Sequence, residues 1–207
     1  MILNDRDLII LGEVFRWRVC LGRHIKELAG FDGQHTCDRR LRKLIDAGFL
    51  ERKKVLYGVP SLYFVTRQGK AFINEPYKAD KLKLEQINHD IEVLEVAIHL
   101  MRSTGIVRTQ ITTEKELHMQ DGFGKAIHRP DFVITDSEGK QACVEVELTP
   151  KGKERTINII KANYVKYDGQ LWFVPVKHQR LIKLLNDASK TYIGLKVYEL
   201  ETVKKIK

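Results

Sequence analysis

Cysteine is scarce in this sequence of 207 residues, and its three copies lie far apart. Cys20, Cys37 and Cys143 form no CxxC pair, which argues against a zinc ribbon or finger. An odd number of widely separated thiols also argues against a disulfide framework and favours a reducing compartment. The cysteines are therefore expected to pack as small apolar side chains.

Long apolar runs are missing as well. No stretch approaches the roughly 18 residues that a membrane-spanning helix needs. The first residues, Met1 to Asp5, lack the basic and then apolar layout of a signal peptide. No phosphate loop, dinucleotide-binding glycine pattern or Ser/His/Asp order is visible. We therefore expect a cytoplasmic protein outside those enzyme classes.

Positive charge is what the sequence has in excess. Lysine and arginine number 36 against 27 aspartates and glutamates, which gives a net charge of +9. This excess raises the expectation of a polyanionic partner. Because many basic proteins are merely soluble, the positions of the charges are more informative than the total. Basic residues cluster at 39–43, at 52–54 and from 151 to 166.

The first 75 residues predict three short helices followed by a hairpin. Asn4 can cap a first helix, a second spans 23–29, and a third starts at His35 or Thr36 and stops at Gly48. Strand-like runs at 49–52 and 62–66 follow, joined through a turn with glycine and proline. This order predicts a winged helix-turn-helix domain over residues 1–75.

The third helix and the hairpin would then be the DNA-binding elements, with the helix in the major groove and the hairpin on the backbone. The predicted DNA-binding residues are Gln34, His35, Arg39, Arg40 and Lys43 on the helix, with Lys53 and Lys54 on the hairpin. Two alternatives stay open. The basic face can be a solvated surface, and winged helices can also bind other proteins.

Residues 76–83 read as a polar linker, and a second domain is expected over 84–207. A long helix from Leu84 to Gly105 can pair across a homodimer or cover a sheet. Strands are expected at 106–111, 131–135, 142–148, 171–176 and 195–200, with helices at 150–167 and 179–188. Thr149 would cap the first of these helices, with Pro150 at its first position. The chain as a whole is predicted to be an α+β protein.

The stretch with the clearest chemical pattern contains three carboxylates. Glu145 and Glu147 alternate with valines, so a strand places both on one face, about 7 Å apart. A turn at 136–139 brings Asp131 onto the neighbouring strand. Three close carboxylates repel one another unless a cation such as Mg²⁺ or Mn²⁺ lies between them, and such a metal can assist hydrolysis of a phosphodiester. Alternatively, these acids form the water-facing side of a sheet.

The motif Pro130-Asp131, a hairpin and then Glu-x-Glu resembles the active-site strands of PD-(D/E)xK nucleases, which have the restriction-endonuclease fold. The order of elements from about residue 84 to 200 is similar too. The resemblance implies that Asp131, Glu145 and Glu147 bind metal. Glu147 stands where lysine is usual, as in an ExE variant of some restriction enzymes. Lys151 or Lys153 can supply the missing positive charge, so the implied catalytic residues are Asp131, Glu145, Glu147 and Lys151.

The whole chain resembles the replication-relaxation family of plasmids and mobile elements, which joins a winged helix to a nuclease-like domain. The matching stretches are 63–69, Pro130-Asp131 and the Glu-x-Glu-Leu-Thr at 145–149. This resemblance implies action in DNA replication, relaxation or transfer. The implied partners are double-stranded DNA and the replication machinery of the element. The alternative is a non-catalytic regulator or accessory factor with a degenerate nuclease fold.

Several other polar residues have simpler predictions. Arg155 and Lys161, on the basic helix after the Glu-x-Glu strand, are expected to contact DNA phosphates together with Lys151 and Lys166. Glu92 and Glu95 are expected to face solvent. His89 and His128 are expected to be structural or surface groups, with His128 close to Asp131.

Overall fold

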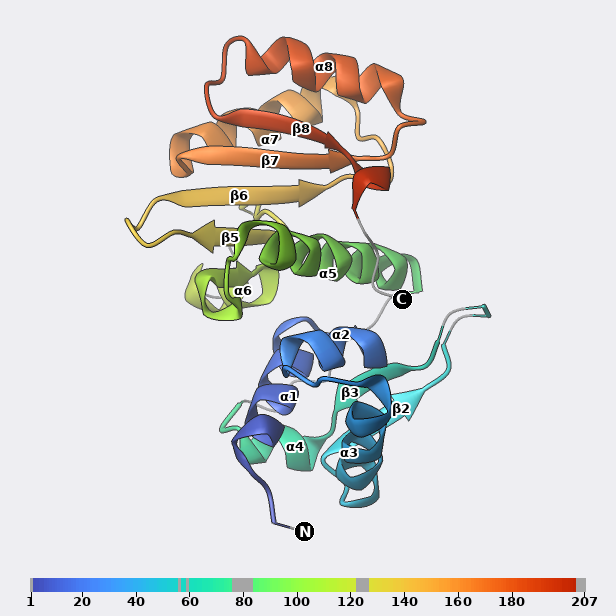
Figure 1. The fold of residues 1–207 in the computed structure, drawn as a ribbon. Coiled ribbons are helices and arrows are strands. Elements are labelled where there is room, and N and C mark those ends of the chain that lie inside the picture. Colours follow the sequence, from blue (N-terminus) through green and yellow to red (C-terminus); the bar gives the residue numbers. More distant parts are fainter. Residues whose placement is uncertain (1, 56, 59, 76–83, 122–126, 204–207) are drawn as a thin grey trace. The chain divides into compact units, whose positions relative to one another are not determined.

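The computed structural model is a mixed α+β protein with two β-sheets (Figure 1). It describes residues 2–55, 57–58, 60–75, 84–121 and 127–203, so the expected linker at 76–83 lies outside the described residues. The chain divides into two compact units, the first ending at Ile98 and the second starting at His99. This division falls inside a long helix, whereas the sequence suggested that a second domain starts at Leu84.

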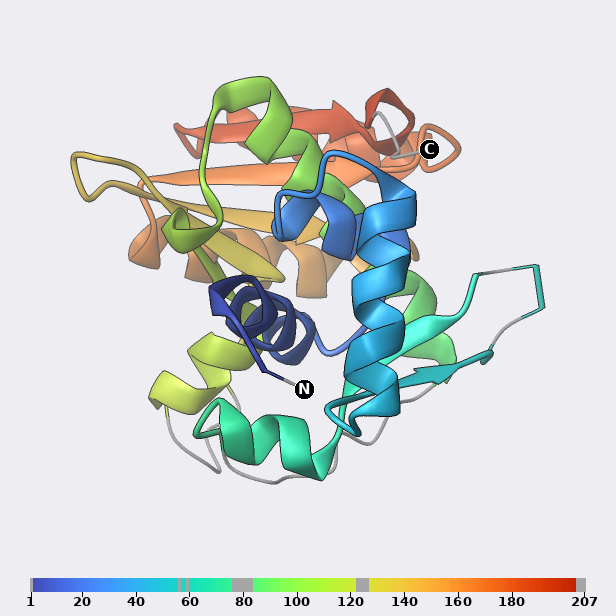
Figure 2. The same cartoon turned by 60° about the horizontal axis from the view of Figure 1, so that its bottom comes forward.

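The first unit contains the helices and the hairpin expected at its N-terminus. Its elements are α1 (Asp5–Arg16), β1 (Cys20–Leu21), α2 (Gly22–Leu28), α3 (Gln34–Asp46), β2 (Leu50–Lys53), β3 (Leu62–Val65), α4 (Arg67–Phe72) and the N-terminal part of α5 (Leu84–Thr104). The three strands form an antiparallel sheet in the order β1-β3-β2. The hairpin of β2 and β3 projects from the helices of this unit (Figure 2).

Local sequence signals explain where these elements begin and end. The Asn4 side chain accepts a hydrogen bond from the backbone N–H of Asp7 at 3.1 Å, and the Asp7 carboxylate accepts one from the N–H of Asn4 at 2.8 Å. This reciprocal cap starts α1. Thr66 Oγ1 caps α4 by accepting from the N–H of Gly69 at 3.0 Å. A Cβ atom at Gly69 would lie 2.3 Å from the carbonyl oxygen of Phe49, so only glycine fits this turn.

The core of the first unit explains why it includes part of α5. Val19, Leu21, Leu62 and Phe64 pack against Ile87 and Ile91, which are on the N-terminal half of that helix. The stripe of apolar residues from 84 onward therefore completes the core of the first unit. Burying these side chains stabilises the unit in proportion to the apolar area removed from water.

The second unit is built on a five-stranded sheet with the order β4-β5-β6-β7-β8 (Figure 1). Its elements after α5 are a 3₁₀ turn (Arg108–Gln110), β4 (Ile111–Thr113), α6 (Glu114–Asp121), β5 (Phe132–Thr135), β6 (Gln141–Val146), α7 (Lys153–Lys166), β7 (Gly169–Val174), α8 (Gln179–Ser189), β8 (Leu195–Glu199) and a second 3₁₀ turn (Leu200–Thr202). The pairs β4–β5 and β5–β6 are antiparallel, and β6–β7 and β7–β8 are parallel.

Three boundaries in this unit differ from expectation. The strand expected at 106–111 is mostly a 3₁₀ turn, and pairing begins only where Ile111 lies opposite Ile134. The helix α6 was not expected. The helix expected at Pro150 begins at Lys153 with Gly152 as its cap. The N–H of Glu147 still donates to the carbonyl of Phe173 at 3.0 Å, and the chain between Glu147 and Gly152 is not helical.

The helices α7 and α8 cover the same face of this sheet. Ile159 and Ile160 of α7 and Leu181 and Leu185 of α8 share one buried cluster with Trp172 of β7. In the parallel pairing of β6 with β7, Glu145 is the partner of Trp172, so its side chain lies on the face that α7 covers. This arrangement places a carboxylate beneath a helix.

None of the helices in the described parts of the chain is both long enough and apolar enough to cross a membrane.

Candidate functional site

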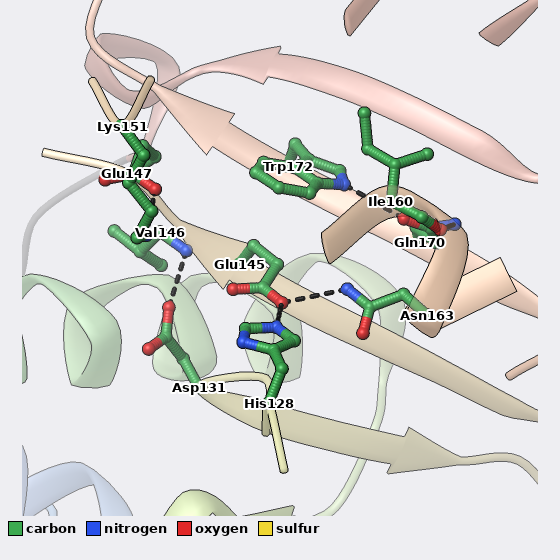
Figure 3. A network of polar contacts seen from close by, with 10 residues as sticks. All are labelled: His128, Asp131, Glu145, Val146, Glu147, Lys151, Ile160, Asn163, Gln170 and Trp172. Carbon is green, nitrogen blue, oxygen red and sulfur yellow. Dashed lines mark hydrogen bonds and ion pairs between the residues drawn. The ribbon is translucent and has the colours of Figure 1, made fainter. Parts of the chain in front are cut away.

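The Glu145 carboxylate is buried, with 5% of the residue exposed, and one of its oxygens has two partners. Oε1 lies 2.6 Å from Nε2 of His128 and accepts a hydrogen bond from Nδ2 of Asn163 at 2.8 Å (Figure 3). His128 precedes β5, and Asn163 is a buried residue of α7. The strand, the segment before β5 and the helix together therefore fix this carboxylate.

The protonation of Glu145 is set by opposing effects. Burial raises its pKa because the charged form loses water, and the nearby charge of Asp131 raises it further. The contacts with His128 and Asn163 act in the opposite direction, but the net result is a raised pKa. Perturbed carboxyls of this kind occur often at functional sites, which makes Glu145 a candidate.

Asp131 lies beside β6, where its Oδ2 accepts a hydrogen bond from the backbone N–H of Val146 at 2.6 Å (Figure 3). Its own N–H donates to the carbonyl of Val144 at 3.1 Å. The aspartate of the Pro-Asp pair is therefore tied to the backbone of the Glu-x-Glu strand through both its main chain and its side chain.

The partner of Glu147 is Lys151, which contacts neither Asp131 nor Glu145 in the hydrogen bonds described above. Glu147 is buried, follows directly after β6, and its Oε2 contacts the ammonium group of Lys151 in the segment before α7. The positive charge expected near this position is thus present at Lys151. Lys153, the other lysine considered, is exposed at the start of α7.

The three carboxylates each have a protein partner of their own. The partners are a backbone N–H for Asp131, His128 and Asn163 for Glu145, and Lys151 for Glu147. Across the described residues, no group of three or more His, Cys, Asp or Glu side chains is placed to hold a metal ion. Glu147 therefore has an ammonium group as its counterion, whereas no lysine or arginine contact is found for Glu145 in the described part of the chain.

The exposed face of α3 carries four of the five residues of this helix that were expected to bind DNA. Gln34, His35, Arg39 and Lys43 are exposed, and Arg42 joins them on this face. The buried face of the helix holds Cys37, Leu41 and Leu44. The side chain of Gln34 donates to Asp38 at 2.7 Å, so one of the expected contacts already has a partner on the same helix.

Arg40 has a different environment from its neighbours on α3. Its Nε donates to Oδ1 of Asp7 at 2.6 Å, its Nη2 pairs with Oδ2, and Asp7 is fully buried on α1. The hydrogen bond with Asp7 raises the pKa of Arg40. Position 40 is three residues from Cys37 and four from Leu44, so it borders the buried face. Arg40, expected at the DNA surface, therefore joins α3 to α1 instead.

The hairpin and α7 present the remaining basic residues that were expected to bind DNA. Lys53 and Lys54 are exposed on the β2 side, and Tyr57 near the tip is fully exposed. Lys53 lies 2.8 Å from Glu51, an exposed ion pair of little energetic weight. In the second unit, Arg155 and Lys161 are exposed on α7.

A second buried carboxylate, Glu95, lies in the first unit and was expected to face solvent. Only 1% of Glu95 is exposed, and its Oε1 accepts bonds from Nε of Arg23 at 3.0 Å, from Nη2 of Arg23 at 2.6 Å, and from Nε2 of His24 at 2.9 Å. Nδ1 of His24 accepts from the N–H of Leu21 at 3.3 Å. This bond requires an unprotonated Nδ1, so His24 is neutral with its hydrogen on Nε2.

The pKa values of this pair follow from the same contacts. Burial lowers the pKa of His24, because the charged ring would lose water. Burial opposes the ionisation of Glu95, but the bonds from His24 and Arg23 outweigh it and lower its pKa to about 2. Glu95 is therefore a buried anion with a compensating guanidinium.

The contacts of Asn163, His128 and Glu95 were not predicted, although the position of each residue in the sequence gives an indication of its role. Asn163 follows Ile159 by four residues and Ile160 by three, so it is a polar residue within an apolar helical stripe. His128 lies three residues before Asp131. Glu95 follows Ile91 by four residues, so it too is a polar residue within an apolar helical stripe, like Asn163. Polar residues at core-facing positions mark internal contacts.

Neither a model of a known protein family nor a curated protein matches this chain. Its function is therefore inferred from the geometry and from the sequence patterns.

Proposed function

We propose that this chain is a double-stranded DNA-binding protein whose first unit acts as a winged helix-turn-helix. The order α1, β1, α2, α3, β2, β3 and the sheet order β1-β3-β2 support this proposal. In such a domain the third helix enters the major groove and the hairpin approaches the phosphate backbone. The observation that most strongly supports DNA binding is the exposed, basic outer face of α3.

The basic residues of α3 differ in whether an acidic residue of the protein already neutralises them. Arg40 is held by the buried carboxylate of Asp7. Arg39 and Lys43 are exposed and pair with no acid among the described residues. Because cations without an internal partner can neutralise phosphates or reach base edges, Arg39 and Lys43 are the principal contacts in this proposal.

The experiment compares Arg39→Ala/Lys43→Ala with Arg40→Ala in the full chain, using fluorescence anisotropy on a mixed-sequence duplex. The first variant is expected to weaken binding and to reduce the slope of log affinity against log salt by about 2, with unchanged thermal stability. Arg40→Ala is expected to lower stability, because it leaves Asp7 buried without its cation. Unchanged affinity and salt slope in Arg39→Ala/Lys43→Ala would overturn the proposal.

For the second unit, we propose a nuclease-like fold in an accessory role rather than a hydrolytic one. The run α5, β4, α6, β5, β6, α7, β7 and the position of Pro130-Asp131 before the Glu-x-Glu strand support the likeness. Asp131, Glu145 and Glu147 each have a separate protein partner, which favours a site that works without a shared metal ion. With the resemblance to replication-relaxation proteins, this points to accessory action on plasmid or mobile-element DNA during replication, relaxation or transfer.

One observation favours a second candidate function, that of a metal-dependent endonuclease. The charge of Asp131 raises the pKa of Glu145, a repulsion that a divalent cation would relieve. Incubation of supercoiled plasmid with Mg²⁺ or Mn²⁺ separates the two candidates. Nicking that is lost in Glu145→Ala and kept in Glu138→Ala, an exposed control, establishes the endonuclease. DNA affinity without nicking or metal binding supports the accessory role.

A further inference from the structure

Positive charge is distributed unevenly within the second unit. Residues 153–190, which run from α7 through α8, contain eight lysines and arginines against three acidic residues. The rest of the unit, residues 99–152 and 191–204, contains nine basic and ten acidic residues. The excess positive charge of this unit therefore belongs to the segment that covers one face of its sheet.

The basic side chains of this segment are exposed. Leu181 and Leu185 of α8 point into the same cluster as Ile159 and Ile160 of α7, so the opposite sides of both helices face solvent. We call the exposed set the α7–α8 basic surface; it consists of Lys153, Arg155, Lys161, Lys166, Lys177, Arg180, Lys183 and Lys190. Both helices therefore present charge on the side away from the sheet.

Few acidic groups neutralise this surface. Asp187 pairs with Lys190 at 2.8 Å, and Glu154 is an exposed acid at the start of α7. Asp168 accepts a hydrogen bond from the N–H of Gln141. Lys161 pairs with no acid among the described residues, whereas Lys183 lies one helical turn before Asp187, whose pKa is lowered by Lys190 and then by Lys183.

Near the start of α8, the spacing of the basic residues does not stabilise the helix. Arg180 and Lys183 are three residues apart, so their side chains are neighbours on the helix surface. Like charges at this spacing repel each other and destabilise a helix. Lys177, just before α8, extends the same row by another three residues. An anionic partner would relieve this repulsion.

We propose that the α7–α8 basic surface is a second DNA-binding surface, which contacts the phosphate backbone of a duplex without reading its bases. A duplex carries closely spaced negative charge along its axis, and lysine and arginine bind it with release of counterions. Contacts to phosphates position a protein without specifying sequence. The inference shares DNA as the ligand with the proposed function, but it rests on residues of the other unit.

The structure favours DNA over an anionic membrane as the occupant. A helix that binds at a membrane surface must insert its apolar face between lipids. The apolar face of α8, with Leu181 and Leu185, is already packed against the sheet. Its outward face is left with polar and charged residues: Gln179, Arg180, Lys183, Asn186, Asp187 and Lys190.

The test compares two double-lysine variants of the full chain. Lys161→Ala/Lys183→Ala removes charge from the surface. Lys140→Ala/Lys196→Ala removes the same charge from exposed positions elsewhere, since Lys140 is in the β5–β6 turn and Lys196 is next to the inward-facing Leu195 on β8. Affinity for a mixed-sequence duplex is measured over a salt series. The surface variant is expected to bind about tenfold more weakly at low salt, with the log–log salt slope reduced by about 2. The control is expected to match the unaltered chain.

The outcomes separate this inference from the proposed function. A normal salt slope in Lys161→Ala/Lys183→Ala, beside a reduced one in Arg39→Ala/Lys43→Ala, overturns the second surface and leaves the first. The reverse result overturns the role of α3 and supports the second surface. If Lys161→Ala/Lys183→Ala loses binding only to phosphatidylserine vesicles and keeps its DNA affinity, the surface is a membrane contact and the inference is wrong. Unfolding curves for every variant ensure that folded proteins are compared.

Discussion

Two buried glutamates, one in each unit, have nearly the same surroundings but opposite acid–base behaviour. Glu95 and Glu145 are 1% and 5% exposed, and each places its Oε1 against a histidine, at 2.9 Å and 2.6 Å. The other partner of Glu95 is the guanidinium of Arg23, whereas that of Glu145 is the neutral amide of Asn163. The pKa of Glu95 falls to about 2, and that of Glu145 is raised.

The difference shows that burial does not by itself determine the charge of a carboxyl group. Arg23 supplies a full positive charge, so Glu95 stays ionised at a cost that its partners offset. Near Glu145 the amide supplies a hydrogen bond but no charge, and Asp131 adds a like charge. Glu95 thus acts as a fixed structural anion. Glu145 is the group whose protonation can respond to a ligand or to pH.

The largest effect is expected from Glu95→Ala. Removing this carboxylate leaves the Arg23 guanidinium and the buried His24 without their acceptor, and breaking a buried ion pair costs about 3–5 kcal/mol. Chemical denaturation should show this loss in the free energy of unfolding. Asp187→Ala, which removes an exposed ion pair, is the control and should leave the free energy of unfolding nearly unchanged. If Glu95→Ala loses no more stability than this control, the buried contacts of Glu95 do not stabilise the first unit.

Acidification should remove a comparable part of this stability. Because the pKa of Glu95 lies below its ordinary 4.5, its contribution is complete above that pH and is lost as the pH falls toward about 2. The shift corresponds to about 3 kcal/mol. The lowered pKa of His24 adds an earlier loss as the pH falls below 6.5. Unfolding measured from pH 7 to pH 2 should show both steps, and Glu95→Gln should lack the lower one. An unaltered lower step in that variant would assign it to other groups.

Arg23→Ala should have a smaller effect than Glu95→Ala, since His24 still donates to the carboxylate. Arg23 is only partly buried, and losing hydrogen bonds to a charged group costs about 2 kcal/mol. The pKa of Glu95 should rise, which moves the acid loss of stability to higher pH. The matched control is Arg16→Ala, which removes a partly exposed arginine from a glutamate on α1. An unchanged acid transition in Arg23→Ala would show that His24 alone keeps Glu95 ionised.

Glu145→Gln should have the smallest effect and the opposite sign. Glutamine keeps an oxygen that can accept from Asn163, but it removes the charge that burial and Asp131 disfavour. A carboxyl with a raised pKa contributes its stability below about pH 4.5 and loses it as the pH rises through the folded value. We expect Glu145→Gln to be more stable than the unaltered chain at pH 8 and to differ little from it near pH 4.5. If Glu145→Gln is less stable than the unaltered chain at pH 8, then the charge of Glu145 stabilises the protein, as that of Glu95 does, and the two glutamates do not differ in this respect.

Much of the fold follows from local sequence signals. Apolar spacing and end signals predicted α1 to α3, the β2–β3 hairpin and the strands β5 to β8 at nearly their observed positions. Two missed elements depend on the rest of the molecule. The strand β1 has two residues and exists because Cys20 and Leu21 pair with β3. The helix α6 is mostly polar and buries only Leu117, so its apolar stripe is too weak to detect.

The site was less predictable than the fold, because its contacts join residues far apart in sequence. Strand alternation identified Glu145 and Glu147, but it could not show that Lys151 contacts one and that His128 and Asn163 hold the other. The convergence of the three acids was expected from strand alternation and from the turn at 136–139. Their actual partners depend on how α7 lies on β6. The internal partner of Arg40 could not be predicted either, since Asp7 is 33 positions away.

The Asp7–Arg40 pair has a consequence for the evolution of this chain. Replacing Arg40 alone leaves the buried Asp7 without its counterion, and replacing Asp7 alone leaves the partly exposed Arg40 without its acceptor, so the two positions should change together or not at all. Arg39 and Lys43, which have no such internal constraint, should instead vary with the DNA that each descendant protein binds. Covariation between positions 7 and 40 among descendants of this sequence would therefore record the attachment of α3 to α1, whereas covariation of positions 39 and 43 with the DNA site would record recognition.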